Sequence, residues 1–103
     1  MTQKQYHARL KKFTRLYRKM RTLTKEMKEA GFAYPIGVSI TSFGNSEIHL
    51  SADQGEVLPE FDFSQIKEYQ SGGKWTELSA RVDGVKFFYL VGSGESDHVG
   101  DQT

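Results

Sequence analysis

The chain contains no cysteine, which excludes disulfide bonds, thiolate metal sites and a cysteine nucleophile. It also lacks long apolar runs. No segment approaches the ~18 apolar residues of a membrane span, and the polar N-terminus lacks the run of about 7 to 15 apolar residues that a secretion signal carries. We therefore expect a cytoplasmic protein that does not enter a membrane.

Acidic residues are absent from residues 4 to 25, where basic residues are dense. Residues 1 to 30 carry ten Lys and Arg against two acids, a net charge of +8, whereas residues 31 to 103 carry four against eleven, a net charge of −7. The overall charge of +1 hides this division. So strong an asymmetry is typical of a segment that binds a polyanion.

A length of 103 residues fits one domain with a modest core. The content of 37% hydrophobic and 13% aromatic residues is too high for a disordered chain. We expect a single domain over residues 1–91 and, from the polar and Gly-rich composition that follows, a flexible tail over residues 92–103.

The N-terminal segment has the pattern of one long amphipathic helix. Thr2 and Gln5 have the spacing of a capping box, and Gly31 suits the C-terminal end. Apolar residues recur at steps of three and four between these ends, at Tyr6, Leu10, Phe13, Tyr17, Met20 and Met27, with Leu16, Leu23 and Ala30 widening the stripe. A helix of this length is about 40 Å long, so part of it must protrude or find a partner.

Beyond Ile36 the apolar period changes to two, which predicts strands. A first hairpin surrounds the sequence SFGNS, and a three-residue loop over residues 43–45 would pair Ile40 with Ile48 and Val38 with Leu50. In a second hairpin, Asp83-Gly84 forms a type I′ turn, with Val82 opposite Val85.

Residues 52–74 have mixed apolar spacing, and we expect a short helix or loop near 56–62 and a strand or helical turn near 64–70. The predicted fold class is α+β. The long N-terminal helix packs on one face of a four- or five-stranded antiparallel sheet built from the two β-hairpins.

No catalytic constellation can be assembled. His7, His49 and His98 are scattered without ligand spacing, and His49 suits an ordinary surface position. Asp53 and Glu56 suit a solvated turn, and residues 72–74 lack the rest of a phosphate-binding loop. We therefore predict no enzyme activity, no metal and no cofactor.

The basic helix is the best candidate site. With the apolar stripe facing the sheet, its cations fall on the outer side, where a solvated face usually mixes charges of both signs. The second hairpin adds Arg81 opposite Lys86, a like-charged pair that either turns toward water or meets an anion. The predicted binding residues are Lys11, Lys12, Arg15, Arg18, Lys19, Arg21, Lys25, Arg81 and Lys86.

Other readings of the helix stay open. Its cations could instead bind an acidic protein surface or simply be solvated. The spacing of Leu10, Phe13, Tyr17 and Met20 also permits pairing of two copies, although Thr24 interrupts that seam. Tyr6 and Tyr17 could stack on bases if they are exposed, but their place in the apolar stripe favours a position in the core.

The segments ELSARVDGVKFFYLV and SITSFGNSEIHLSAD, preceded by a charged helix, resemble those of small accessory proteins encoded by bacteriophages and other mobile elements. Proteins of that kind, anti-CRISPR proteins among them, are often non-enzymatic inhibitors that bind host nucleic-acid machinery. The resemblance implies that the helix would contact guide RNA, target DNA or an acidic surface of a CRISPR effector. It transfers no functional residue.

Together these observations predict a small non-enzymatic protein whose basic helix engages nucleic acid or a nucleoprotein complex. The alternatives are a phage-type inhibitor that blocks a nucleic-acid-processing effector through protein contacts, and a structural homodimer.

Overall fold

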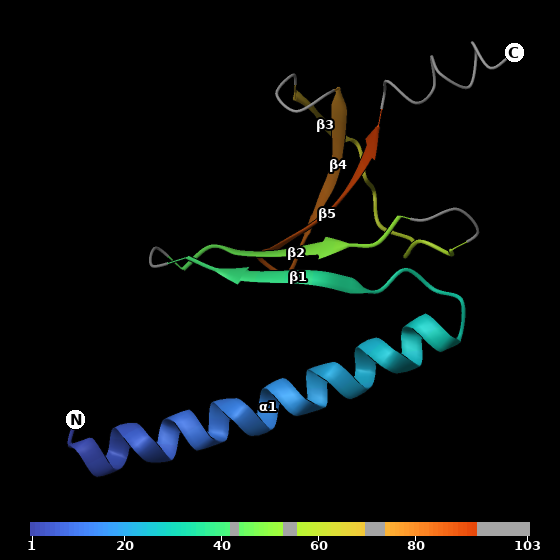
Figure 1. Cartoon of the computed structure of the whole chain (residues 1–103). Helices are drawn as coiled ribbons and strands as arrows, with labels where there is room; N and C mark the ends of the chain where they lie inside the picture. The colour runs from blue at the N-terminus through green and yellow to red at the C-terminus, as the bar shows by residue number, and fades with distance from the viewer. Residues whose placement is uncertain (42–43, 53–55, 70–73, 93–103) are drawn as a thin grey trace, which may run out of the picture.

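The computed structural model describes residues 1–41, 44–52, 56–69 and 74–92, and confirms the α+β class (Figure 1). One helix precedes five strands that form one sheet in the order β1-β2-β5-β4-β3. The elements are α1 (Gln3–Glu29), β1 (Pro35–Ile40), β2 (Ser46–Leu50), β3 (Gln65–Tyr69), β4 (Trp75–Val82) and β5 (Val85–Gly92). Within the described residues, no helix combines the length and apolar character needed to cross a membrane.

Helix α1 begins and ends where its sequence predicts. The Thr2 side chain accepts a hydrogen bond from the Gln5 amide at 3.1 Å, while the Thr2 amide donates to the Gln5 side chain at 2.9 Å, so the capping box is confirmed. At the other end Ala30 is the C-cap, and Gly31 adopts φ +84°. That left-handed conformation strongly favours glycine.

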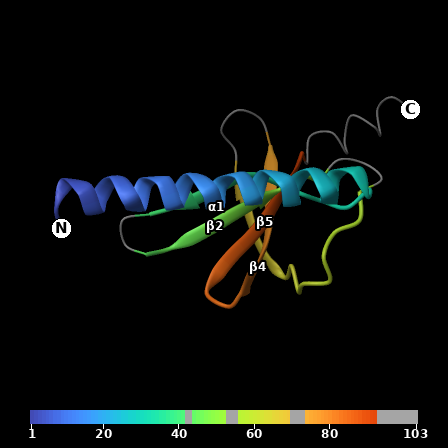
Figure 2. The same cartoon turned by 90° about the horizontal axis from the view of Figure 1, so that it is seen from below.

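The expected packing of the helix on the sheet is wrong. No residue of α1 is buried, and none of the strands makes extensive contact with it. Viewed from below the helix, its N-terminal end projects past the strands (Figure 2). Helical periodicity shows that an apolar stripe exists, but it carries no information about which surface covers that stripe.

The sheet is mixed rather than antiparallel. The two predicted hairpins are present, but β2 and β5 join them in parallel, with Ser46 opposite Val85 and Ile48 opposite Phe87. Strand β3 then pairs with the outer side of β4. Local turn signals predict each hairpin but not which strand of one lies beside the other, so the parallel junction could not be read from the sequence.

The register of the first hairpin differs from the predicted one by two residues. Val38 lies opposite Ile48, and Ile40 lies opposite Ser46. The Thr41 amide donates to the Asn45 carbonyl at 2.9 Å, so the loop begins and ends one residue earlier than predicted. A shift of two keeps every side chain on its predicted face, which is why the alternating pattern did not distinguish the two registers.

The second hairpin is confirmed in its turn and its register. Val82 pairs with Val85, Ala80 with Phe87 and Leu78 with Tyr89. Asp83 and Gly84 both have positive φ, at 50° and 79°, as a type I′ turn requires. The strand alternative for residues 64–70 is likewise confirmed by β3.

Residues 56–63 contain no helix. Val57 instead bridges Phe32, which links the chain after α1 to this segment. Farther on, Phe61 packs against Phe87 with ring centroids 5.0 Å apart, and Phe63 packs edge-on against Tyr89 at 5.1 Å. This segment therefore covers the apolar face of the second hairpin.

The core is small. Ala33, Leu50 and Ala80 are the buried hydrophobic residues among those described, each about 5% exposed. The predicted start of the tail at residue 92 is one residue too early, because Gly92 is the last residue of β5, and residues 93–103 lie outside the described residues. Part of the loop predicted over 43–45 also lies outside the described residues, as do residues 72 and 73 and Asp53, which was expected in a solvated turn.

The hairpin turn yields a stability test. Replacing Gly84 by alanine places a Cβ at φ +79°, where nothing lies within 4 Å of it, so the cost is purely conformational. We expect Gly84→Ala to lower the free energy of unfolding by about 1 to 2 kcal/mol, measured by urea denaturation. The matched control is Asp83→Gly, which places a glycine at the other positive-φ position of the turn. It should leave the urea midpoint unchanged or raise it.

Candidate nucleic-acid interface

Seven of the predicted binding residues lie on α1, and all seven are exposed. At 100° per residue, six of them fall on the side opposite the apolar stripe, and Arg21 lies at the border. We call this set the basic face: Lys11, Lys12, Arg15, Arg18, Lys19, Arg21 and Lys25.

The described residues do not neutralise the charges of the basic face. Within the described residues, none of these seven side chains forms an ion pair. The two acids of α1, Glu26 and Glu29, lie at its C-terminal end. Two other cations of α1 make contacts within the chain. Arg9 donates a hydrogen bond to the Gln5 carbonyl at 3.2 Å, and the Lys28 ammonium lies 5.5 Å from the centre of the Tyr34 ring.

The basic face also has the dimensions of a backbone-binding surface. From Lys11 to Lys25 the helix rises about 21 Å, so one cation occurs for about every 3 Å of its length. Phosphates along one strand of a duplex are spaced by about 3.4 Å along the axis. The linear charge densities therefore match.

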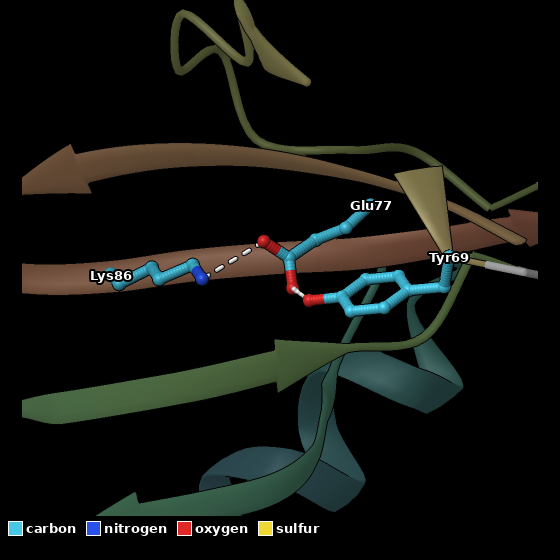
Figure 3. A network of polar contacts seen from close by, with 3 residues as sticks. All are labelled: Tyr69, Glu77 and Lys86. Atoms are coloured by element: carbon cyan, nitrogen blue, oxygen red, sulfur yellow. Dashed lines mark hydrogen bonds and ion pairs between the residues drawn. The ribbon is translucent and has the colours of Figure 1, made fainter. Parts of the chain in front are cut away.

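The remaining two predicted residues lie on the sheet, away from the basic face. Arg81 and Lys86 are opposite each other on β4 and β5, as expected, and Arg81 is exposed. Lys86 meets an anion, but an internal one: its Nζ lies 2.8 Å from Oε2 of Glu77 (Figure 3). The structure thus does not bring these two residues together with the helix cations.

Glu77 is the centre of a polar network that the sequence did not reveal. Its carboxylate is nearly buried, and it accepts hydrogen bonds from Lys86 and, at 3.0 Å, from the Tyr69 hydroxyl (Figure 3). The hydrogen bond to Glu77 raises the pKa of Lys86, and partial burial opposes this. Three residues from three strands are involved, so only the tertiary arrangement could show the network.

His49 is not the ordinary surface residue that its strand pattern predicts. Its ring stacks on Phe88, with centroids 4.6 Å apart, and is partly buried. Burial lowers the pKa of His49, and the nearby Glu77 carboxylate opposes the shift. Within the described residues, no three His, Asp or Glu side chains are grouped closely enough to hold a metal ion.

Tyr6 and Tyr17 are exposed rather than in the core, by 48% and 55%. The prediction that both residues lie in the core, which came from their position in the apolar stripe, is therefore wrong. Their rings are accessible, but they lie on the side of α1 opposite the basic face, so they do not extend that face.

Comparison of the chain with protein-family models, with curated proteins and with solved structures gives no match. The resemblance to phage accessory proteins therefore stays a prediction.

The network around Glu77 predicts a large effect of removing its cation. Lys86→Met leaves a nearly buried carboxylate without its charge partner, and we expect the free energy of unfolding to fall by about 3 kcal/mol. Urea denaturation at pH 7 measures it. The double variant Lys86→Met/Glu77→Leu removes both charges and should recover most of the loss. An equal loss in both variants would show that the ion pair is not the cause.

His49 predicts a pH dependence of stability. Its pKa in the folded chain is below the unfolded value of about 6.5, so the unfolded chain binds the proton more readily as the pH falls through this region. The contribution of His49 to the free energy of unfolding is therefore fully present above about pH 6.5 and is lost as the pH falls below it. His49→Phe keeps the aromatic stack and should flatten the decline, measured as urea midpoints between pH 5 and 7.5. His7→Gln, on the helix that does not pack on the sheet, should leave the decline as it was.

Proposed function

We propose that the protein is a non-enzymatic binding protein whose basic face on α1 engages the phosphate backbone of nucleic acid, alone or within a nucleoprotein complex. The observation that carries this proposal is a row of seven exposed cations without ion pairs among the described residues. Binding a polyanion releases counterions from each neutralised phosphate, which makes such a row favourable.

The mode of binding follows from the side chains available. Lysine and arginine on a helix face contact phosphates and fix position without reading bases. Of the two predicted binding residues on the sheet, Lys86 is held by Glu77. Weak sequence preference is therefore expected, and Arg81 is the predicted residue left to add contacts from the sheet.

An inhibitor that acts through protein contacts is the second candidate. The net charge of −7 over residues 31 to 103 favours it, because an acidic sheet could bind a basic nucleic-acid channel of an effector protein. The likeness to phage accessory proteins points the same way. In that case the sheet, rather than the basic face, would carry the affinity.

Salt dependence of binding tests the first candidate. With about six phosphate contacts, affinity for labelled DNA or RNA should fall about 10³-fold between 50 and 200 mM salt. Lys11→Glu/Arg15→Glu/Lys19→Glu should abolish most of the binding and reduce the slope of log affinity against log salt by about 3. Fluorescence anisotropy with single-stranded and duplex probes measures both.

Lys67→Glu/Lys74→Glu, which changes exposed cations of the sheet half, is the control and should bind nearly as the unsubstituted chain does. Undetectable binding at 20 mM salt would refute direct nucleic-acid binding. Equal losses in the helix and sheet variants would show only a general effect of net charge, which also contradicts a localised basic face.

A further inference from the structure

Within the described residues, most of the apolar stripe of α1 has no cover, and only Met27 at its C-terminal end is partly buried. Seven of its members are between 41% and 63% exposed. They are Tyr6, Leu10, Phe13, Leu16, Tyr17, Met20 and Leu23. At about 100 Å² of exposed surface for each such side chain, the stripe amounts to roughly 700 Å². Monomeric proteins seldom leave a contiguous apolar patch larger than a few hundred Å² without an interaction to cover it.

The chain's own sheet is a poor cover for this stripe. Strand β1, the nearest strand in Figure 1, has six residues and spans about 20 Å, half the length of the helix. The chain that follows α1 is fixed, because the Ala33 amide donates to the Val57 carbonyl at 2.7 Å and Ser51 donates to the Tyr34 carbonyl at 2.9 Å. The N-terminal half of the stripe, from Tyr6 to Phe13, has no strand of comparable length to lie on.

A second copy of the helix matches the stripe in length and spacing. Apolar residues recur in steps of three and four from Tyr6 to Met20, and the same heptad register extends through the polar Gln3 and Thr24 to cover Gln3 to Met27. Counted in this way, the a positions hold Gln3, Leu10, Tyr17 and Thr24, and the d positions hold Tyr6, Phe13, Met20 and Met27. Two copies would bury roughly 1,400 Å² in total, which is within the range of stable protein interfaces.

Thr24 does not interrupt this seam as its polarity suggests. Its hydroxyl donates to the Met20 carbonyl of the same helix at 2.8 Å. Thr14, which flanks the seam, does the same to Leu10 at 2.9 Å. Both hydroxyls are therefore satisfied before any partner arrives, and burying these residues leaves no unpaired polar group.

The residues beside the seam favour an antiparallel pair. When Leu10 faces Met20 of the second copy, Leu16 lies beside its own counterpart and Leu23 beside Arg9. In a parallel pair the two leucines would instead lie beside Arg21 and Lys28. Antiparallel pairing also sets Glu26 and Glu29, in the C-terminal turn that also holds Lys28, toward the N-terminal end of the other helix, which carries Lys4.

We propose that the apolar stripe of α1 binds the same stripe of a second copy of this chain, in an antiparallel helix pair. The two basic faces then point outward on opposite sides of the pair. This inference rests on the stripe alone and does not require that the basic face bind nucleic acid.

The oligomeric state without nucleic acid tests the proposal. Sedimentation equilibrium of the full chain should show a dimer at micromolar concentration. Phe13→Ala/Tyr17→Ala should raise the dissociation constant of the dimer more than about 100-fold. Circular dichroism should show that the helix is retained, because alanine favours helix. Lys11→Glu/Arg15→Glu/Lys19→Glu, on the opposite side, should leave the dimer intact. A monomer at all concentrations, or a dimer insensitive to Phe13→Ala/Tyr17→Ala, would overturn the proposal.

The absence of cysteine permits a direct test of orientation. When the Leu10→Cys variant is mixed with the Met20→Cys variant and oxidised, the antiparallel pair should give the mixed disulfide as the main product. Predominant linkage of Leu10→Cys chains to each other would indicate a parallel pair and overturn the proposed arrangement. Loss of dimerisation with nucleic-acid binding retained, or the reverse, separates the failure of this inference from the failure of the proposed function.

Discussion

The pairing of β5 with both of its neighbours is the interaction on which the sheet depends. Strand β5 joins β4 in a long antiparallel ladder and β2 in a shorter parallel one, so it connects two hairpins that would each be marginal alone. Phe87 and Tyr89 on β5 are also the residues against which Phe61 and Phe63 pack. Without the β2–β5 junction, the first hairpin would lose its strand pairing with the second.

The sheet holds itself together largely by pairing and by a few aromatic contacts, because its buried core is small. The Glu77 network fits this picture. It links β3, β4 and β5 on the face opposite the aromatic cluster. Glu77 also forms an ion pair with Lys86, which would otherwise be an unpaired like charge opposite Arg81. All five strands are thus joined by strand pairing that does not involve the helix.

That independence gives α1 two surfaces free for other molecules. The basic face suits a polyanion because its cations are exposed and unpaired within the described part of the chain. The apolar stripe suits another apolar helix because its spacing is regular and its threonine hydroxyls are already bonded. Since the two surfaces lie on opposite sides of one rod, occupation of one does not obstruct the other, and a pair of helices would present cations outward on both sides.

The sequence by itself determined the features that depend on near neighbours. The capping box at Thr2, the end of α1 at Gly31 and the type I′ turn at Asp83-Gly84 all follow from local hydrogen bonding and backbone conformation. The segregation of cations from apolar residues on α1 also follows from helical periodicity. Only the tertiary structure decided what each face meets. It placed β2 parallel to β5, bound Lys86 to Glu77, and left most of the α1 stripe uncovered by the other described residues. These outcomes join residues far apart in the chain, and a periodic pattern specifies that a face is apolar or charged but not which surface it contacts.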